Sequence, residues 1–100
     1  MIKMPIRVKV VDKQTVIDLA KQITREDVYD FLEHHGDLEY YQHALHLGVQ
    51  RKGQAFMNAM DTEWYELIAG TPEDPFATDD DYSVALAVAW LTAQEIANES

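Results

Sequence analysis

The stretch VALAVAWL, residues Val84–Leu91, is apolar at every position, and it decides the fold of this chain. A helix that is apolar on all sides is normally buried by its neighbours. Ala85, Ala87, Ala89 and Ala93 are small enough to let other backbones approach the helix. The bulky side chains are those of Leu86, Trp90 and Ile96. We therefore predict a buried last helix over about Asp81–Asn98, with the other elements packed around it.

Three consecutive aspartates, Asp79, Asp80 and Asp81, stand at the start of this helix. Carboxylates at a helix start accept hydrogen bonds from free backbone N–H groups and meet the positive end of the helix dipole. The run lacks the glycine and the terminal glutamate of a calcium-binding loop. Helix capping is therefore the interpretation that the pattern favours.

The length and composition of the chain set its class. One hundred residues are the usual size of one domain. The chain has no cysteine, which excludes disulfides, thiolate metal sites and cysteine nucleophiles, and which fits a reducing compartment. The N-terminus lacks the apolar core of a signal peptide, and every apolar run is far shorter than the ~20 residues that span a membrane. We expect a soluble, cytoplasmic protein.

Charge is distributed unevenly along the chain. Every Lys and Arg lies at or before Lys52, whereas residues 53–100 hold ten acidic residues and no basic one. The net charge of −10 therefore belongs to the second half. Such a field repels the phosphates of nucleic acids and membranes and attracts basic protein surfaces. The alternative is a solvated face that keeps a small protein soluble.

Local patterns predict the elements that precede the last helix. Pro5–Val11 alternates in hydrophobicity and is rich in β-branched residues, which predicts a short strand. We expect a first helix over about Lys13–Gln22 and a second that begins at the capping box Thr24–Asp27 and ends at Gly36. A third helix is expected to begin near Asp37, because Leu38, Tyr41, Leu45 and Val49 form an apolar stripe. A short fourth helix is expected from Asp61 to Gly70. The apolar stripe is interrupted at Gln50–Gln54 and continues with Phe56, Met57 and Met60. The segment Thr71–Thr78 contains two prolines and is predicted to be a loop.

The predicted fold class is thus mainly α, with four to five helices and a short N-terminal β-strand. We expect a single domain over residues 1–100, with residues 1–11 extended as the strand. Residues 12–98 form the helical body, a small bundle around the buried C-terminal helix.

Histidines near the middle of the chain raise the question of a metal site. Glu39, His43 and His46 can share one helix face, because positions i, i+4 and i+7 are neighbours. They could bind zinc if His34 or His35 supplied a fourth ligand, but the spacing matches no known zinc motif. There is also no phosphate-binding glycine loop, nucleophile motif or tuned acid–base pair. We expect no metal, no other cofactor and no enzymatic activity.

A DNA-binding interpretation starts from Ala44–Val49. This stretch, followed by Arg51 and Lys52, is similar to the turn of a helix-turn-helix motif. However, Gln54 stands where a buried aliphatic residue is usual, and Gly53 would weaken a recognition helix by about 1 kcal/mol. Together with the acidic second half, these residues argue against direct contact with nucleic acid.

The second half carries a resemblance to a known family. Its matching residues are Ala44-Leu45-His46-Leu47-Gly48, Glu63-Trp64, Pro75-Phe76, Asp81, Ala85, Ala89 and Ala97-Asn98. Over roughly residues 44–98 the chain resembles the minor tail protein T type of tail assembly proteins of long, flexible-tailed bacteriophages. The interval from Trp64 to Pro75 is longer than in that family, Ala77 replaces the loop glycine, and aspartates stand where the family often has arginine.

The resemblance implies a non-enzymatic, cytoplasmic chaperone or adaptor for phage tail assembly. Such proteins hold the tape measure protein soluble, recruit tail tube subunits and are absent from the finished particle. The implied partners are proteins, without direct nucleic acid or membrane contact, and a homo-oligomer is compatible with the sequence. The alternative is a small acidic inhibitor that blocks a basic nucleic-acid-binding site of a host protein. Binding by such an inhibitor would weaken steeply with salt, whereas groove binding would not.

If the resemblance holds, it points to one edge of the domain as the partner-binding surface. Trp64 and Phe76 flank the proline loop, and Asp79, Asp80 and Asp81 lie beside it in sequence. Aromatic anchors dominate interface energetics, and an acidic patch can orient a basic partner. The other interpretation is that the two aromatic side chains close the core over the last helix.

Overall fold

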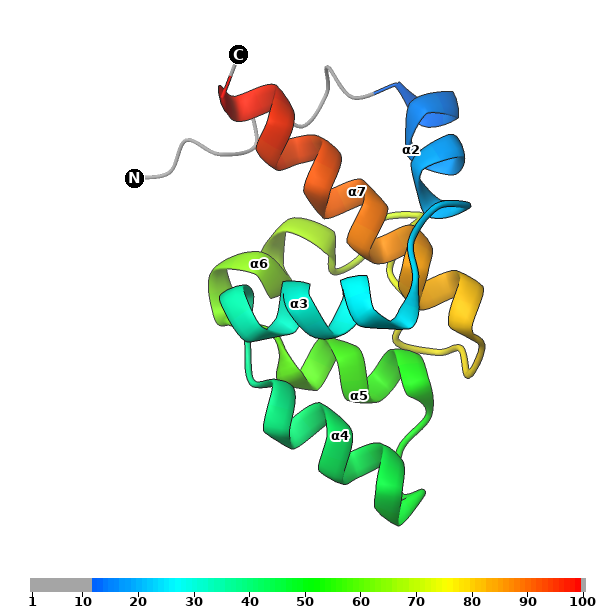
Figure 1. Cartoon of the computed structure of the whole chain (residues 1–100), viewed down its shortest axis with the longest axis vertical. Coiled ribbons are helices and arrows are strands. Elements are labelled where there is room, and N and C mark those ends of the chain that lie inside the picture. Colours follow the sequence, from blue (N-terminus) through cyan, green and yellow to red (C-terminus); the bar gives the residue numbers. More distant parts are fainter. Residues whose placement is uncertain (1–11, 100) are drawn as a thin grey trace.

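The computed structural model describes residues 12–99, and every regular element among them is a helix (Figure 1). The elements are α2 (Lys13–Ala20), α3 (Arg25–His35), α4 (Leu38–Leu47), α5 (Lys52–Ala59), α6 (Thr62–Ile68) and α7 (Asp81–Glu99). The mainly α class is therefore confirmed. Six helices lie within the described part of the chain, rather than four to five. The strand predicted at Pro5–Val11 falls outside the described residues.

The additional helix arises because the predicted apolar stripe breaks at Gly48. This residue adopts the left-handed conformation, with φ of 67°, and its N–H bonds to the carbonyl of Ala44 at 3.1 Å. Glycine adopts this conformation without steric cost, so it ends α4 and turns the chain. Val49, expected on the buried stripe, is consequently 66% exposed. α5 then starts afresh at Lys52.

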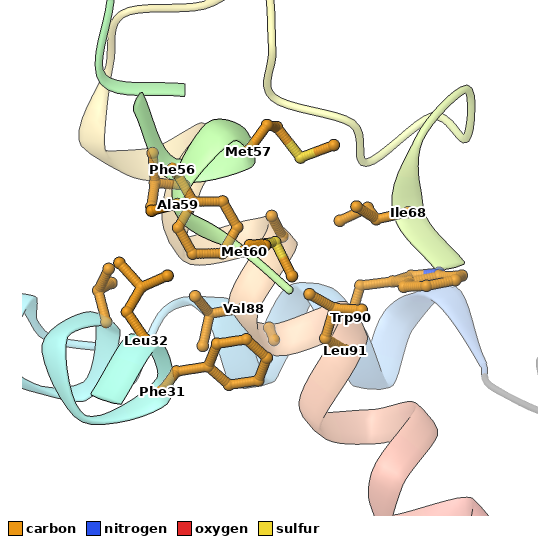
Figure 2. Packing of buried hydrophobic residues seen from close by; sticks show 14 of the residues in the cluster. Phe31, Leu32, Phe56, Met57, Ala59, Met60, Ile68, Val88, Trp90 and Leu91 are labelled. Atoms are coloured by element: carbon orange, nitrogen blue, oxygen red, sulfur yellow. The ribbon is translucent and has the colours of Figure 1, made fainter. Parts of the chain in front are cut away.

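α7 lies at the centre of the domain, as its apolar sequence predicts. It packs against α2, α3, α5 and α6. Figure 2 shows Val88, Trp90 and Leu91 of this helix among residues from α3, α5 and α6. Burial extends around the helix, since Val84, Ala87, Val88, Ala89 and Leu91 are each at most 2% exposed. Ile96, which the sequence suggested as core bulk, is instead exposed.

α5 is the second buried helix. Its buried residues are Gly53, Ala55, Phe56, Met57 and Ala59. The ring of Phe56 is fully buried and lies 6.3 Å from the ring of Phe31 and 6.4 Å from that of Tyr41, measured between centroids. α5 therefore joins α3 and α4 to the core that α7 organises.

Two interhelical turns are locked to each other. Gly36, between α3 and α4, forms an isolated antiparallel bridge with Met60, between α5 and α6. The N–H of Asp37 donates to the carbonyl of Ala59 at 2.7 Å, and the N–H of Asp61 donates to the carbonyl of His35 at 3.0 Å. This pairing satisfies backbone groups that the helix ends leave free and fixes the α3–α4 pair against α5 and α6.

The loop between α6 and α7 is also anchored. Glu73 is buried, and its carboxylate pairs with the ammonium group of Lys13 at 2.8 Å, which ties the loop to α2. Pro75 is buried and Phe76 is partly buried against the core. The loop therefore holds α2, α5 and the start of α7 together.

A candidate protein-binding hollow at three helix starts

The predicted acidic run begins with a residue that caps a distant helix. The carboxylate of Asp79 accepts a hydrogen bond from the backbone N–H of Lys52 at 2.9 Å. Its neighbour Thr78 accepts one from the N–H of Gly53 at 3.1 Å. α5 begins at two basic residues, Arg51 and Lys52, which are unfavourable at the positive end of a helix dipole. Asp79 supplies the missing negative charge and acceptor.

The other two aspartates also have partners within the chain. Asp80 caps α7, because its carboxylate accepts from the N–H of Ser83 at 2.7 Å. Asp81 lies 3.2 Å from the ammonium group of Lys52 and 3.9 Å from the guanidinium group of Arg25. These ion pairs are exposed and hence individually weak. The carboxylates of this run nevertheless neutralise part of the positive charge of Lys52 and Arg25 and of the helix starts of the same chain.

The starts of α3, α5 and α7 meet around one open hollow of about 440 Å³. We call it the tyrosine hollow, and its principal lining residues are Arg25, Val28, Tyr29, Tyr41, Leu45, Lys52, Asp79, Asp81, Val84 and Ala85. The apolar members and the two tyrosines belong to α3, α4 and α7, whereas the charged members stand at the three helix starts. The hollow therefore combines an apolar interior with a rim of paired charges.

Tyr41 is the most buried polar side chain of the hollow. Its ring lies edge-on to that of Tyr29, with 6.2 Å between centroids. Burial, with a smaller contribution from Tyr29, raises the pKa of Tyr41 to about 12. The phenol, which is neutral at physiological pH in any tyrosine, here stays neutral to still higher pH, so Tyr41 adds no charge to the hollow.

Exposed apolar side chains lie next to lining residues along the chain. Leu47 is 54% exposed and Val49 is 66% exposed, and they flank Gly48, which also lines the hollow. Tyr82, 51% exposed, follows Asp81. Large apolar residues at such exposure enlarge the apolar surface that a protein partner could cover.

The two aromatic residues predicted to bind a partner lie elsewhere. The ring of Trp64 lies 4.3 Å from that of His35 and 5.7 Å from that of Phe31, at the end of α3. Phe76 lies under the guanidinium group of Arg51, 5.9 Å from it. Both are partly buried against the core, and neither lines the tyrosine hollow. The structure thus brings Asp79 and Asp81 into the hollow and leaves Trp64 and Phe76 outside it.

The histidines of α4 remain apart from other metal ligands. Glu39, His43 and His46 are all exposed. Within residues 12–99, no three His, Cys, Asp or Glu side chains are grouped so that they could hold a metal ion. On α3, a hydrogen bond to the Asp30 carbonyl and the charge of the Asp30 carboxylate raise the pKa of His34.

The helix-turn-helix interpretation meets a steric obstacle. The helix that would read DNA is α5, and more than half of its residues are buried. Its first turn is covered by the loop that contains Thr78 and Asp79. A recognition helix must instead present its residues to the major groove.

The cap on α5 gives a stability prediction. Replacing Asp79 with alanine should lower the free energy of unfolding by about 1 kcal/mol, the usual cost of losing a helix cap. Urea denaturation followed by circular dichroism measures this change. Glu66→Ala, at an exposed position of α6, is the matched control and should change stability by less than about 0.5 kcal/mol. Equal effects of the two substitutions would contradict the capping role.

Within residues 12–99, no helix combines the length and the apolar character that crossing a lipid bilayer requires. Comparison of the whole chain with protein-family models, with curated proteins and with solved structures finds no match.

Proposed function

We propose that this protein is a non-enzymatic chaperone or adaptor for phage tail assembly. It binds tape measure protein, tail tube protein or both in the host cytoplasm, and the tyrosine hollow is its binding site. The observation that carries the proposal is the open hollow with an apolar interior, whose lining residues Gly48 and Asp81 are next along the chain to the exposed Leu47, Val49 and Tyr82.

The hollow is built partly from the segment that carries the resemblance to tail assembly proteins. The resemblance to tail assembly proteins covers roughly residues 44–98. More than half of the residues around the hollow come from this segment: Leu45, Gly48, Gln50, Lys52, Asp79, Asp81, Val84 and Ala85. The remaining lining residues, Ile23, Thr24, Arg25, Val28, Tyr29 and Tyr41, come from the part of the chain before this segment.

The shape and chemistry of the hollow suit one class of ligand. An amphipathic helix lays apolar side chains into a groove between the helices of its receptor. Tape measure proteins are long helices whose apolar faces must be covered before the tube forms. Because Asp79 caps the backbone of α5 and Asp81 pairs with Lys52 and Arg25 of the same chain, the rim favours neither charge strongly. The apolar interior then supplies most of the affinity.

The acidic inhibitor gains less support from the geometry. Asp79, Asp80 and Asp81 were the densest acidic run available to mimic nucleic acid. Their carboxylates are engaged with Lys52, Ser83 and Arg25. A basic partner would therefore compete with contacts inside the chain.

Coexpression tests the proposal. A tape measure fragment from a long-tailed phage should remain soluble when it is produced with this protein. A Leu47→Glu/Val49→Glu variant should lose most of this effect, because charges placed beside the hollow would have to be desolvated on binding. Ile96→Glu, at an exposed position near the other end of α7, is the control and should retain it. If the unmodified protein solubilises neither tape measure nor tube protein, the proposal is wrong.

A further inference from the structure

A second hollow lies on another side of α3, among α2, α3 and α7. We call it the histidine hollow. It measures about 580 Å³, and its apolar lining comes from Leu19, Ile23, Phe31 and Val88. Figure 1 shows α7 beside α2, and α7 contacts both α2 and α3. The proposed chaperone site does not use this surface.

The charged lining of the histidine hollow is one-sided. It contains the carboxylates of Asp27, Asp30 and Glu95, the imidazoles of His34 and His35, and neither lysine nor arginine. Asp27 is committed to capping α3, since it accepts the N–H of Thr24 at 2.9 Å. Asp30, on α3, and Glu95, on α7, remain, and their side chains are 72% and 42% exposed.

These two carboxylates have only loose contacts with the histidines. Asp30 lies 3.7 Å from Nδ1 of His34, and Glu95 lies 3.6 Å from Nε2 of His35. Both distances exceed the 2.7–3.2 Å typical of a hydrogen bond from nitrogen to oxygen. A cation entering the hollow can therefore pair with either carboxylate without displacing a strong partner.

We propose that the histidine hollow binds an arginine side chain presented by a partner protein. The aliphatic part of arginine packs on apolar surface while its head group stays polar, which suits the partly exposed Leu19 and Ile23. Its planar guanidinium group pairs with carboxylates, which suits Asp30 and Glu95. This charge complementarity identifies the occupant. The inference does not depend on tail assembly, because it concerns a different surface and a chemical class of partner.

A peptide titration tests the inference on the full-length chain. The probe is the capped peptide Leu-Ala-Arg-Ala-Leu, added to ¹⁵N-labelled protein at low salt. Backbone signals around Phe31, Val88 and Glu95 should shift in a saturable manner. The same peptide with citrulline, which has the shape of arginine without its charge, should bind at least tenfold more weakly.

Two charge-matched variants locate the site. Asp30→Asn/Glu95→Gln removes both carboxylates and should weaken binding of the arginine peptide at least tenfold. Glu63→Gln/Glu66→Gln changes the net charge equally at exposed positions of α6 and should leave binding nearly unchanged. Circular dichroism confirms that both variants are folded.

Three outcomes would overturn the inference. The first is equal binding of the arginine and citrulline peptides. The second is equal weakening by the two variants, which would show that only net charge matters. The third is sedimentation of the unmodified protein as a dimer that Asp30→Asn/Glu95→Gln dissociates, because a second copy would then occupy the hollow.

Discussion

Replacing Trp90 with alanine should lower the free energy of unfolding by about 3–5 kcal/mol, the usual cost of truncating a buried large aromatic residue. Trp90 is 8% exposed on the central helix α7. Figure 2 shows its ring extending toward Ile68, which belongs to α6. Natural domains are stable by about 5–15 kcal/mol, so the variant would lose a large share of its stability.

Urea denaturation measures this loss, with circular dichroism as the main probe and the fluorescence of the remaining Trp64 as a second. Tyr82→Ala is the matched control, because Tyr82 is an aromatic residue of the same helix that is 51% exposed. It should change stability far less than Trp90→Ala. A Trp90→Ala protein that unfolds at the same urea concentration as its parent would contradict the central position of α7.

The structural features that could be predicted from the sequence are those that depend on residues close together along the chain. The apolar run around Val88 is buried whichever elements surround it, so its place in the core needs no knowledge of topology. The capping box at the start of α3 is equally local. Thr24 and Asp27 exchange both of the expected hydrogen bonds, from the Thr24 N–H at 2.9 Å and from the Asp27 N–H at 3.2 Å.

The features that escaped prediction depend on contacts between distant residues. The sequence predicts that Asp79 caps α7, whereas in the structure it caps α5 at Lys52, 27 positions earlier in the chain. The tyrosine hollow requires Tyr29, Tyr41 and Val84 to meet from three helices, and no spacing in the sequence encodes that meeting. Trp64 and Phe76 looked adjacent through the proline loop, but their ring contacts belong to different parts of the fold.

The second large effect is expected at Gly53, where the loop before α7 approaches the backbone of α5. A Cβ atom added to Gly53 would lie 1.7 Å from the carbonyl oxygen of Pro75 and 3.0 Å from that of Thr78. Backbone oxygens cannot yield as a flexible side chain can, so Gly53→Ala must push the loop away from α5. That movement would also strain the cap from Asp79 and the hydrogen bond from the Gly53 N–H.

We expect Gly53→Ala to destabilise the protein by about 3 kcal/mol, from overpacking together with partial loss of a helix cap. Helix propensity alone predicts the opposite sign, because alanine is about 1 kcal/mol better than glycine within a helix. Urea denaturation therefore separates the two effects by sign as well as by size.

Gly48→Ala is the control, because a Cβ atom added to Gly48 meets open space. Only the left-handed backbone of Gly48, with φ of 67°, opposes this substitution, at a cost of about 1–2 kcal/mol. A Gly53→Ala protein at least as stable as its parent would show that the loop does not sit on α5, and the tyrosine hollow would then lose the helix start that supplies Lys52.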